Sequence, residues 1–349
     1  MNINKELRYK LAPQMKVYDS LGYRFLPYIM FTQPPNFRSE VLNTDERGFR
    51  FNSKVTKKSI FDEIKKNETI LFLGGSAAFG VGSTKDENSI TGILEKKSEC
   101  NFLNLGGRAF TGFQEIISLF SNIDNLEKLN IKKIIVFSGT NDFYLNNFFD
   151  VRYPGLFYFN SIFSQKMNTF SLKKNFFIKL LEFFLTDHNK YNFNNLNKNN
   201  FLKFLISGKF RKNSLNSDFQ TMALDNIIKR NFNFYRILKK IFNCDLVFIF
   251  QPILNWCKTP NNEEKSLLKY SDLYFPKQNR YVNKFLSKNH HKEFSNLLKD
   301  ISALNEIKFY DMNDFFKEKN LEKEWLFVDN IHLTDDGNKH TSEYLANFI

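Results

Sequence analysis

Short apolar runs recur along the chain, and each is followed by small or polar residues. These runs begin at Thr69, Phe102, Lys133, Asp245 and Lys308. A short run without polar interruption is typical of a strand buried on both faces of a parallel sheet. Between the runs, apolar residues recur at helical spacing, for example over residues 113–123, 219–241 and 285–304. The alternation predicts an α/β fold in three layers, with about five parallel strands and helices on both faces.

Three stretches depart from this alternation. Residues 1–60 interleave aromatic residues with prolines, which predicts an irregular lead-in packed on the main domain at 61–349. Residues 143–216 are rich in Phe, Asn and Lys and only weakly periodic, which predicts a mostly helical insertion beside the crevice of the sheet. Residues 253–280 predict a long loop that lines a pocket.

Composition narrows the class of protein. Hydrophobic residues make up 42% of the 349 residues, which is enough for a sizeable core. The formal net charge of +13 favours an anionic substrate or partner, such as a phosphorylated sugar, an anionic glycan or a membrane surface touched peripherally. No arginine–aromatic motif of an RNA-recognition module is present, so nucleic acid is not the expected partner. The three cysteines are scattered without metal-ligand spacing and predict no disulfide framework.

The start of the sequence bears on localisation. The first ten residues are charged and lack the apolar core of a signal peptide. The longest apolar runs are too short to span a bilayer. We therefore expect a cytoplasmic protein without a transmembrane segment.

Polar residues follow several of the predicted strands. Ser76 comes after Gly74 and Gly75 at the end of the first strand, and Asn141 follows the third. The carboxyl ends of parallel strands meet at one edge of an open α/β sheet, where ligands collect. Ser76 is then either a nucleophile or a turn serine that caps the next helix.

A carboxylate and a histidine stand just before the last predicted helix. Thr334 is expected to be the N-cap of that helix, and the two aspartates after it match the positive end of the helix dipole. A lone histidine is usually structural. Here Asp329 precedes His332 by three residues, which favours a functional pair.

Together these segments resemble the SGNH hydrolases, the GDSL-like esterase superfamily, over residues 69–347. Four blocks carry the resemblance and stand in the family's order: Gly74-Gly75-Ser76-Ala77-Ala78-Phe79-Gly80, Asn104-Leu105-Gly106-Gly107-Arg108-Ala109-Phe110, Gly139-Thr140-Asn141-Asp142 and Asp329-Asn330-Ile331-His332. The resemblance implies a flavodoxin-like α/β/α fold and ester chemistry that needs neither a metal nor another cofactor.

The resemblance also implies a role for each block. Ser76 would be the nucleophile, His332 the base, and Asp329 the carboxylate that orients the imidazole and stabilises its charged form. The backbone amide of Ser76, an amide of the second block and the side chain of Asn141 would form the oxyanion hole.

Two positions depart from the family pattern. Gly75 replaces the aspartate that usually precedes the nucleophile, as in a Gly-Gly-Ser subset of the superfamily; that aspartate is not a triad member. The glycine of the second block most often lies five residues after the asparagine, where this chain has Ala109. The Ala109 amide can donate there if its φ is negative, and Gly107 is the competing donor.

The substrate class is an expectation drawn from the resemblance. Some members with a Gly-Phe-Arg segment before the first strand act on surface glycans, and this chain has Gly48-Phe49-Arg50. Arg47 and Arg50 either reach the site or are solvated. We expect an esterase that removes an O-acyl group, most simply O-acetyl, from a carbohydrate or glycan precursor. Acyl transfer to a sugar by the same triad is the alternative, and a non-catalytic glycan-binding protein is a further one.

Overall fold

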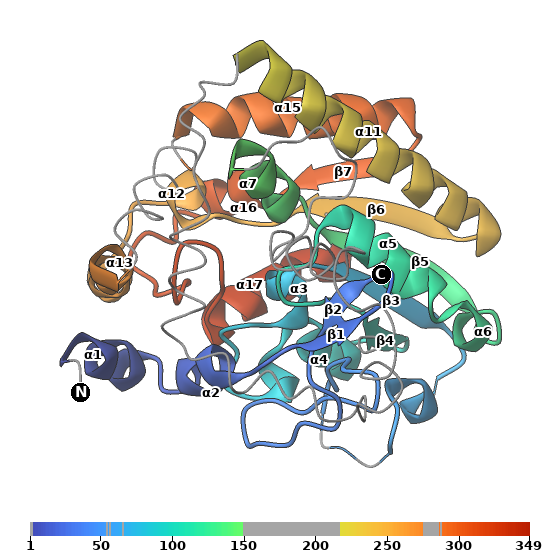
Figure 1. Ribbon diagram of the computed structural model, residues 1–349, viewed down its shortest axis with the longest axis horizontal. Coiled ribbons are helices and arrows are strands. Elements are labelled where there is room, and N and C mark those ends of the chain that lie inside the picture. The colour runs from blue at the N-terminus through green and yellow to red at the C-terminus, as the bar shows by residue number, and fades with distance from the viewer. Residues whose placement is uncertain are drawn as a thin grey trace, which may run out of the picture.

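A computed structural model describes residues 3–53, 55, 57–64, 66–148, 217–274, 286 and 288–349. Its centre is a parallel sheet of five strands (Figure 1), which confirms the predicted α/β fold. In chain order the strands are β3 (Thr69–Gly74), β4 (Asn101–Asn104), β5 (Ile131–Ser138), β6 (Asp245–Phe250) and β7 (Lys308–Asp311). All five begin within two residues of the starts expected from the apolar runs.

The spatial order of these strands is β4-β3-β5-β6-β7. Numbered along the sheet's own sequence this is 2-1-3-4-5, the flavodoxin-like order of doubly wound sheets. The direction of winding reverses between β3 and β5. Ligands of open α/β sheets bind outside the carboxyl ends of the strands at such a point. The sheet therefore directs attention to the residues that follow β3 and β5.

Each central strand is apolar on both faces because it is covered on both. In β3, Leu71 and Leu73 belong to one core cluster, whereas Ile70 and Phe72 belong to another. The first cluster contains residues of α5 (Gly112–Phe120), α11 (Ser217–Ile241) and α15 (Lys288–Leu304). The second contains residues of α4 (Ile90–Lys97), α16 (Met312–Glu318) and α17 (Asp335–Leu345). Figure 1 shows α11 and α15 on one side of β6 and β7, and α17 on the other.

The N-terminal segment is more ordered than its sequence predicted. It forms two helices, α1 (Ile3–Leu11) and α2 (Met15–Ser20), and an antiparallel pair of strands, β1 (Arg24–Leu26) and β2 (Met30–Thr32). The hydroxyl of Tyr18 donates to the carbonyl oxygens of Gly80 and Ser83, both at 3.0 Å. The segment thus contacts the loop that follows the first strand of the sheet. The division of the chain at residue 60 stays a prediction.

Two other expectations need revision. The segment 253–280 is not a plain loop, because it contains α12 (Leu254–Cys257) and α13 (Asn262–Tyr274). The expectation that this segment lines a pocket is confirmed, because Trp256 lines one together with Lys258 and His291. Trp256 is 1% exposed and donates its indole N–H to the carbonyl of Leu286 at 3.0 Å. Of the expected insertion, residues 143–148 lie in α7 (Thr140–Phe148), and 149–216 lie outside the described residues.

The remaining described elements connect these layers. They are η1 (Ile60–Glu63), α3 (Ser76–Phe79), η2 (Asp86–Asn88), α6 (Ile123–Leu126) and η5 (Ala346–Phe348). The last helix begins as expected, since the Thr334 side chain accepts from the Gly337 amide at 3.2 Å. Among the helices of the described residues, none has the length and apolar character needed to cross a membrane.

Candidate active site

Ser76 lies at the point where the first sheet strand turns into α3. Gly74 ends β3 with a φ of +152°, and a Cβ atom there would stand 2.1 Å from the carbonyl oxygen of Phe137. Only glycine fits this close approach of two strands. Ser76 follows at the first helical position with 9% of its surface exposed. Its hydroxyl does not cap the helix; it contacts a histidine from the far end of the chain.

His332 and Asp329 lie on a tight loop between two backbone pairs. Phe327 and Leu333 form an antiparallel bridge, and the Val328 amide donates to the His332 carbonyl at 2.9 Å. Within the loop, Asp329 Oδ1 accepts from the amides of Ile331 and His332, both at 3.0 Å. These bonds form an Asx-type turn that fixes the carboxylate.

The three side chains form a continuous hydrogen-bonded row. His332 Nε2 is 2.7 Å from Ser76 Oγ, and His332 Nδ1 is 2.8 Å from Asp329 Oδ2. Burial alone would raise the pKa of Asp329, but the adjacent His332 and the Arg8 guanidinium hold it below its usual value. An ionised Asp329 accepts a hydrogen bond from Nδ1–H of His332, which leaves the Nε2 lone pair free to accept the hydroxyl hydrogen of Ser76. The row has the order serine, histidine and carboxylate.

The side chain of Asn141 lies close to Gly75, the residue before Ser76. Asn141 lies in α7 directly after β5, across the winding reversal from Ser76. Its Nδ2 donates to the Phe110 carbonyl at 2.7 Å. A Cβ atom on Gly75 would stand 2.7 Å from that same Nδ2 atom. Gly75 therefore leaves the space that the amide of Asn141 occupies beside Ser76.

The backbone of the second block, which is expected to supply one oxyanion donor, differs from the sequence-based expectation. The φ of Ala109 is +63°, not the negative value that an alanine usually adopts. It is the third residue of a turn in which the Phe110 amide donates to the Gly107 carbonyl at 3.1 Å. That position favours glycine because it needs a left-handed backbone. The amide of Gly107 donates to the Gly74 carbonyl at 3.0 Å, whereas that of Ala109 has no acceptor among the described residues.

Arg108 fixes this turn to the N-terminal segment, a role that sequence reasoning missed. Its guanidinium donates to the carbonyl oxygens of Tyr18, Leu21 and Gly22 at 2.9, 2.9 and 2.6 Å. Its Nε donates to Gln33 Oε1 at 2.6 Å. An alanine keeps a positive φ only when the surrounding contacts hold it in that conformation. These four hydrogen bonds do so. The position of Arg108 within the second block was the only available signal.

The arginines of the Gly-Phe-Arg region do not behave as expected. Arg50 is neither solvated nor directed at the triad: it is 0% exposed, and its Nε is 2.8 Å from Asp86 Oδ1. Its Nη1 donates to the Gly80 carbonyl at 2.6 Å, behind the helix that carries Ser76. Arg47 donates to Asn122 Oδ1 at 2.5 Å. Both therefore support the fold.

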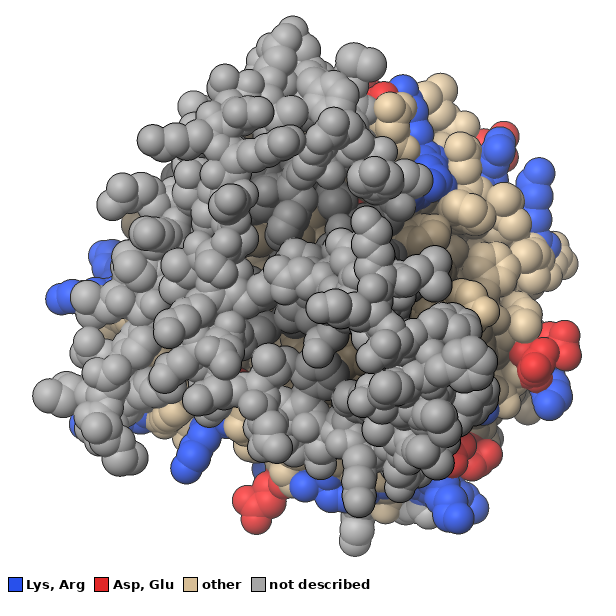
Figure 2. All heavy atoms as spheres, viewed as in Figure 1, with Lys and Arg blue, Asp and Glu red and all other residues tan. Residues whose placement is uncertain are grey.

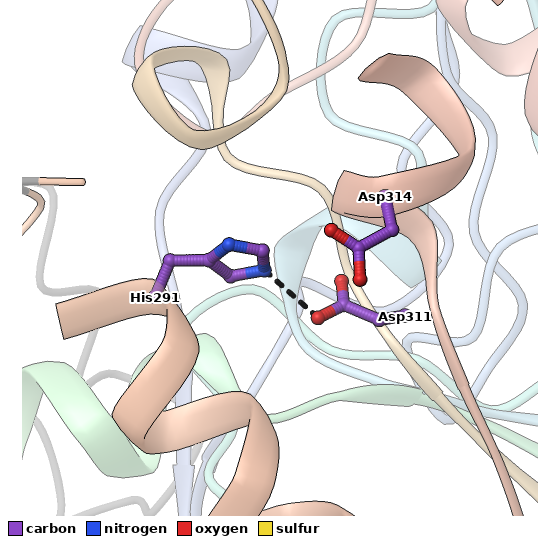
Figure 3. Close-up of side chains that lie close together, drawn as sticks. All are labelled: His291, Asp311 and Asp314. Carbon is purple, nitrogen blue, oxygen red and sulfur yellow. Dashed lines mark hydrogen bonds and ion pairs between the residues drawn. The ribbon is translucent and has the colours of Figure 1, made fainter. Parts of the chain in front are cut away.

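A second polar cluster lies at the end of β7 (Figure 3). His291 Nε2 is 2.8 Å from Asp311 Oδ2, and Asp314 stands beside them with ligand atoms all within 4.8 Å. Lys317 Nζ is 3.1 Å from His291 Nδ1 and 3.0 Å from Asp314 Oδ1. The lysine ammonium thus already supplies the positive charge that these groups attract. We interpret the cluster as a partly exposed ion-pair network rather than a metal site.

Basic residues on the surface are interspersed with acidic ones. On the face in Figure 2, Lys and Arg side chains of the described residues stand at several separate places, some beside Asp or Glu. Exposed ion pairs include Lys96–Glu87 and Lys132–Glu68. The net positive charge therefore does not define one anion-binding patch within the described part of this face.

No protein-family model matches the sequence, and no curated protein matches it. Among solved structures, an acetyl xylan esterase is 13% identical with a TM-score of 0.38, over 80% of this chain and 99% of that one. A protein of the lipolytic G-D-S-L family from Veillonella parvula is 12% identical with a TM-score of 0.39, over 80% and 97%. A GDSL-like lipase from Bacteroides thetaiotaomicron is 10% identical with a TM-score of 0.40, over 82% and 92%. These values support no inference about activity, so the chemistry of this chain is argued from its own side chains.

Proposed function

We propose that this chain is a serine esterase of the SGNH type that removes a short O-acyl group. The observation that carries the proposal is the row Ser76–His332–Asp329, with hydrogen-bond distances of 2.7 and 2.8 Å. A general base must lie within about 2.6–3.2 Å of the proton it abstracts. The row meets this requirement at the edge where a doubly wound sheet binds its ligands.

The reaction follows from these positions. His332 Nε2 takes the proton of Ser76 as Oγ attacks the acyl carbon, and Asp329 stabilises the resulting imidazolium. The amides of Ser76 and Ala109 and the Nδ2 of Asn141 are the donors assigned to the oxyanion. The imidazolium then protonates the leaving alcohol oxygen. Water, deprotonated by the same nitrogen, attacks the acyl-enzyme and releases the carboxylic acid.

The setting of Ser76 favours a small acyl group. Only 9% of its surface is exposed, so a bulky acyl chain would have to displace the surrounding residues. Acetyl is the simplest group of this size, and we propose an O-acetylated carbohydrate or glycan precursor as the substrate. Cytoplasmic action on such a precursor stays a prediction.

The test combines activity with covalent labelling. Wild type should release acetate from aryl acetates and acetylated oligosaccharides, and a fluorophosphonate should label Ser76. Ser76→Ala should abolish both signals while the melting temperature changes little, because the change removes one oxygen atom whose hydrogen bond goes to the His332 ring. His332→Ala should act similarly, and Asp329→Ala should retain more activity. Equal hydrolysis by wild type and Ser76→Ala would refute the proposal.

Transfer is separated from hydrolysis by adding sugar acceptors. An assay with and without acceptor measures free acetate against acylated sugar. If acylated sugar dominates at millimolar acceptor against water at roughly 55 M, the site is built for the acceptor and the protein is a transferase. We expect free acetate to dominate.

A further inference from the structure

Two charged residues of the N-terminal helices stand next to the proposed triad. Arg8 of α1 places Nη2 3.9 Å from Asp329 Oδ2. On its other side, Arg8 Nε is 3.0 Å and Nη2 is 3.4 Å from the two carboxylate oxygens of Asp19, which lies in α2. Arg8 is 8% exposed, so solvent screens its charge weakly. A row of alternating charge thus leads from Asp19 through Arg8 to Asp329.

Other groups around Arg8 are aromatic. Tyr270 of α13 presents its ring 5.7 Å from the guanidinium carbon. The hydroxyl of Tyr9 donates to Asp19 Oδ2 at 3.3 Å. Burial and the Asp19 carboxylate raise the pKa of Tyr9 to about 12, so it stays uncharged near neutral pH. Within the described residues, Asp19 and Asp329 are therefore the anions facing Arg8, and the His332 ring lies beyond Asp329.

The two oxygens of Asp329 have separate partners. Oδ1 accepts from two backbone amides, which hold the carboxylate in place. Oδ2 bonds to the His332 ring and faces Arg8. Removing the guanidinium would leave the backbone bonds intact but would change the charge that His332 experiences. The contact between Arg8 and Asp329 is therefore suited to an electrostatic effect on His332 that acts through Oδ2 of Asp329.

We propose that Arg8 is a positioning residue that acts through Asp329, and that Asp19 moderates its charge. This inference rests on the proposed function. A cation behind Asp329 opposes the positive charge that His332 acquires when it takes a proton, so it keeps the base uncharged to lower pH. The Asp19 carboxylate offsets part of that effect. The N-terminal helices therefore set the pH range over which the nucleophile is active.

The test compares substitutions that should have opposite signs. Arg8→Gln should move the acid limb of the pH profile for fluorophosphonate labelling upward by about 0.5 pH unit, and Asp19→Asn should move it downward by a smaller amount, because Asp19 lies farther from His332 and is more exposed. The double variant should lie between wild type and Arg8→Gln, and Arg8→Lys should retain the wild-type limb because the charge remains. The titration of the His332 ring, followed by NMR and assigned with His332→Ala, should shift in the same directions.

A matched control is the exposed pair Lys96–Glu87, whose side chains are 53% and 47% exposed. Lys96→Gln and Glu87→Gln should leave the limb in place, because solvent screens them. Shifts of one sign, or none, in Arg8→Gln and Asp19→Asn would overturn the inference while Ser76 labelling upheld the esterase. If Ser76 is not labelled, the proposed function fails, and the NMR shifts still decide whether Arg8 and Asp19 act on His332. If Arg8→Gln does not fold, Asp19→Asn and Arg8→Lys provide the decision.

Discussion

Gly75 and Asn141 show how one missing side chain shapes the site. The space beside Gly75 contains the amide nitrogen of Asn141, 2.7 Å from where a Cβ atom would stand. Real Cβ atoms do not approach so closely, so any larger residue must displace the amide. The position that commonly holds an aspartate in the family that this chain resembles is thus coupled here to Asn141, the side chain proposed as an oxyanion donor.

We therefore expect Gly75→Ala to lower kcat by about 10- to 100-fold with a nearly unchanged KM. Loss of a whole donor typically costs about 100- to 1,000-fold in kcat, and Asn141→Ala should approach that range. The double variant should be no slower than Asn141→Ala alone, because both changes act on the same amide. Full activity in Gly75→Ala would show that Asn141 is not a donor.

Sequence reasoning placed the candidate site residues better than the backbone around them. Ser76, Asn141, Asp329 and His332 follow strand ends or precede a cap, and such positions can be recognised from the apolar pattern. The positive φ of Ala109 could not be predicted from the sequence, because it depends on the hydrogen bonds that hold the turn in place. Arg8 carried no motif, since its contact with Asp329 joins residues far apart in the chain.

At the scale of elements, Arg108 fastens the second-block turn to the N-terminal segment. It is 7% exposed and donates to three backbone carbonyls and Gln33. Arg108→Met would leave these acceptors buried without a donor, and each such group costs about 1–3 kcal/mol. We expect a loss of at least about 3 kcal/mol in urea unfolding, with faster proteolysis in residues 3–53.

The matched control for that change is Arg24→Met on the exposed edge of β1, which should cost less than about 0.5 kcal/mol. Equal stability of the two variants would show that the N-terminal segment is held by other contacts.

In the same range of the chain, the sequence pattern did not predict the helices α1 and α2. They are 9 and 6 residues long, and helices this short depend on packing for most of their stability.

The whole molecule contains a buried acid that should make its stability depend on pH. Glu115 of α5 accepts from the hydroxyls of Ser138 and Tyr235, the latter at 3.0 Å. Burial, which outweighs those hydrogen bonds, raises the pKa of Glu115 from 4.5 to about 8. The folded state therefore holds a proton that the unfolded state releases. Its contribution to stability is complete below pH 4.5 and is lost as pH rises through 8.

Glu115→Gln should remove this dependence, because the amide cannot ionise. The unfolding free energy of wild type relative to Glu115→Gln should fall between pH 5 and 8, by at most ~1.4 kcal/mol per pH unit. Urea titrations of both proteins across that range measure the difference. Glu127→Gln on the exposed surface serves as the control. Parallel curves for wild type and Glu115→Gln would mean that Glu115 is ionised in the folded protein.

Strands that are apolar on both faces have a consequence for how they are aligned. Sliding such a strand by one residue exchanges one apolar face for another, so burial alone does not select the pairing. The polar residues at the carboxyl ends do select it. Asn104 of β4 donates to the Ala78 carbonyl at 3.0 Å, and Asp311 of β7 bonds to His291 and Ser295. A shift of the register by one residue would leave these polar groups without hydrogen-bond partners. The edge that carries the proposed chemistry is therefore also the edge that fixes the register of the sheet.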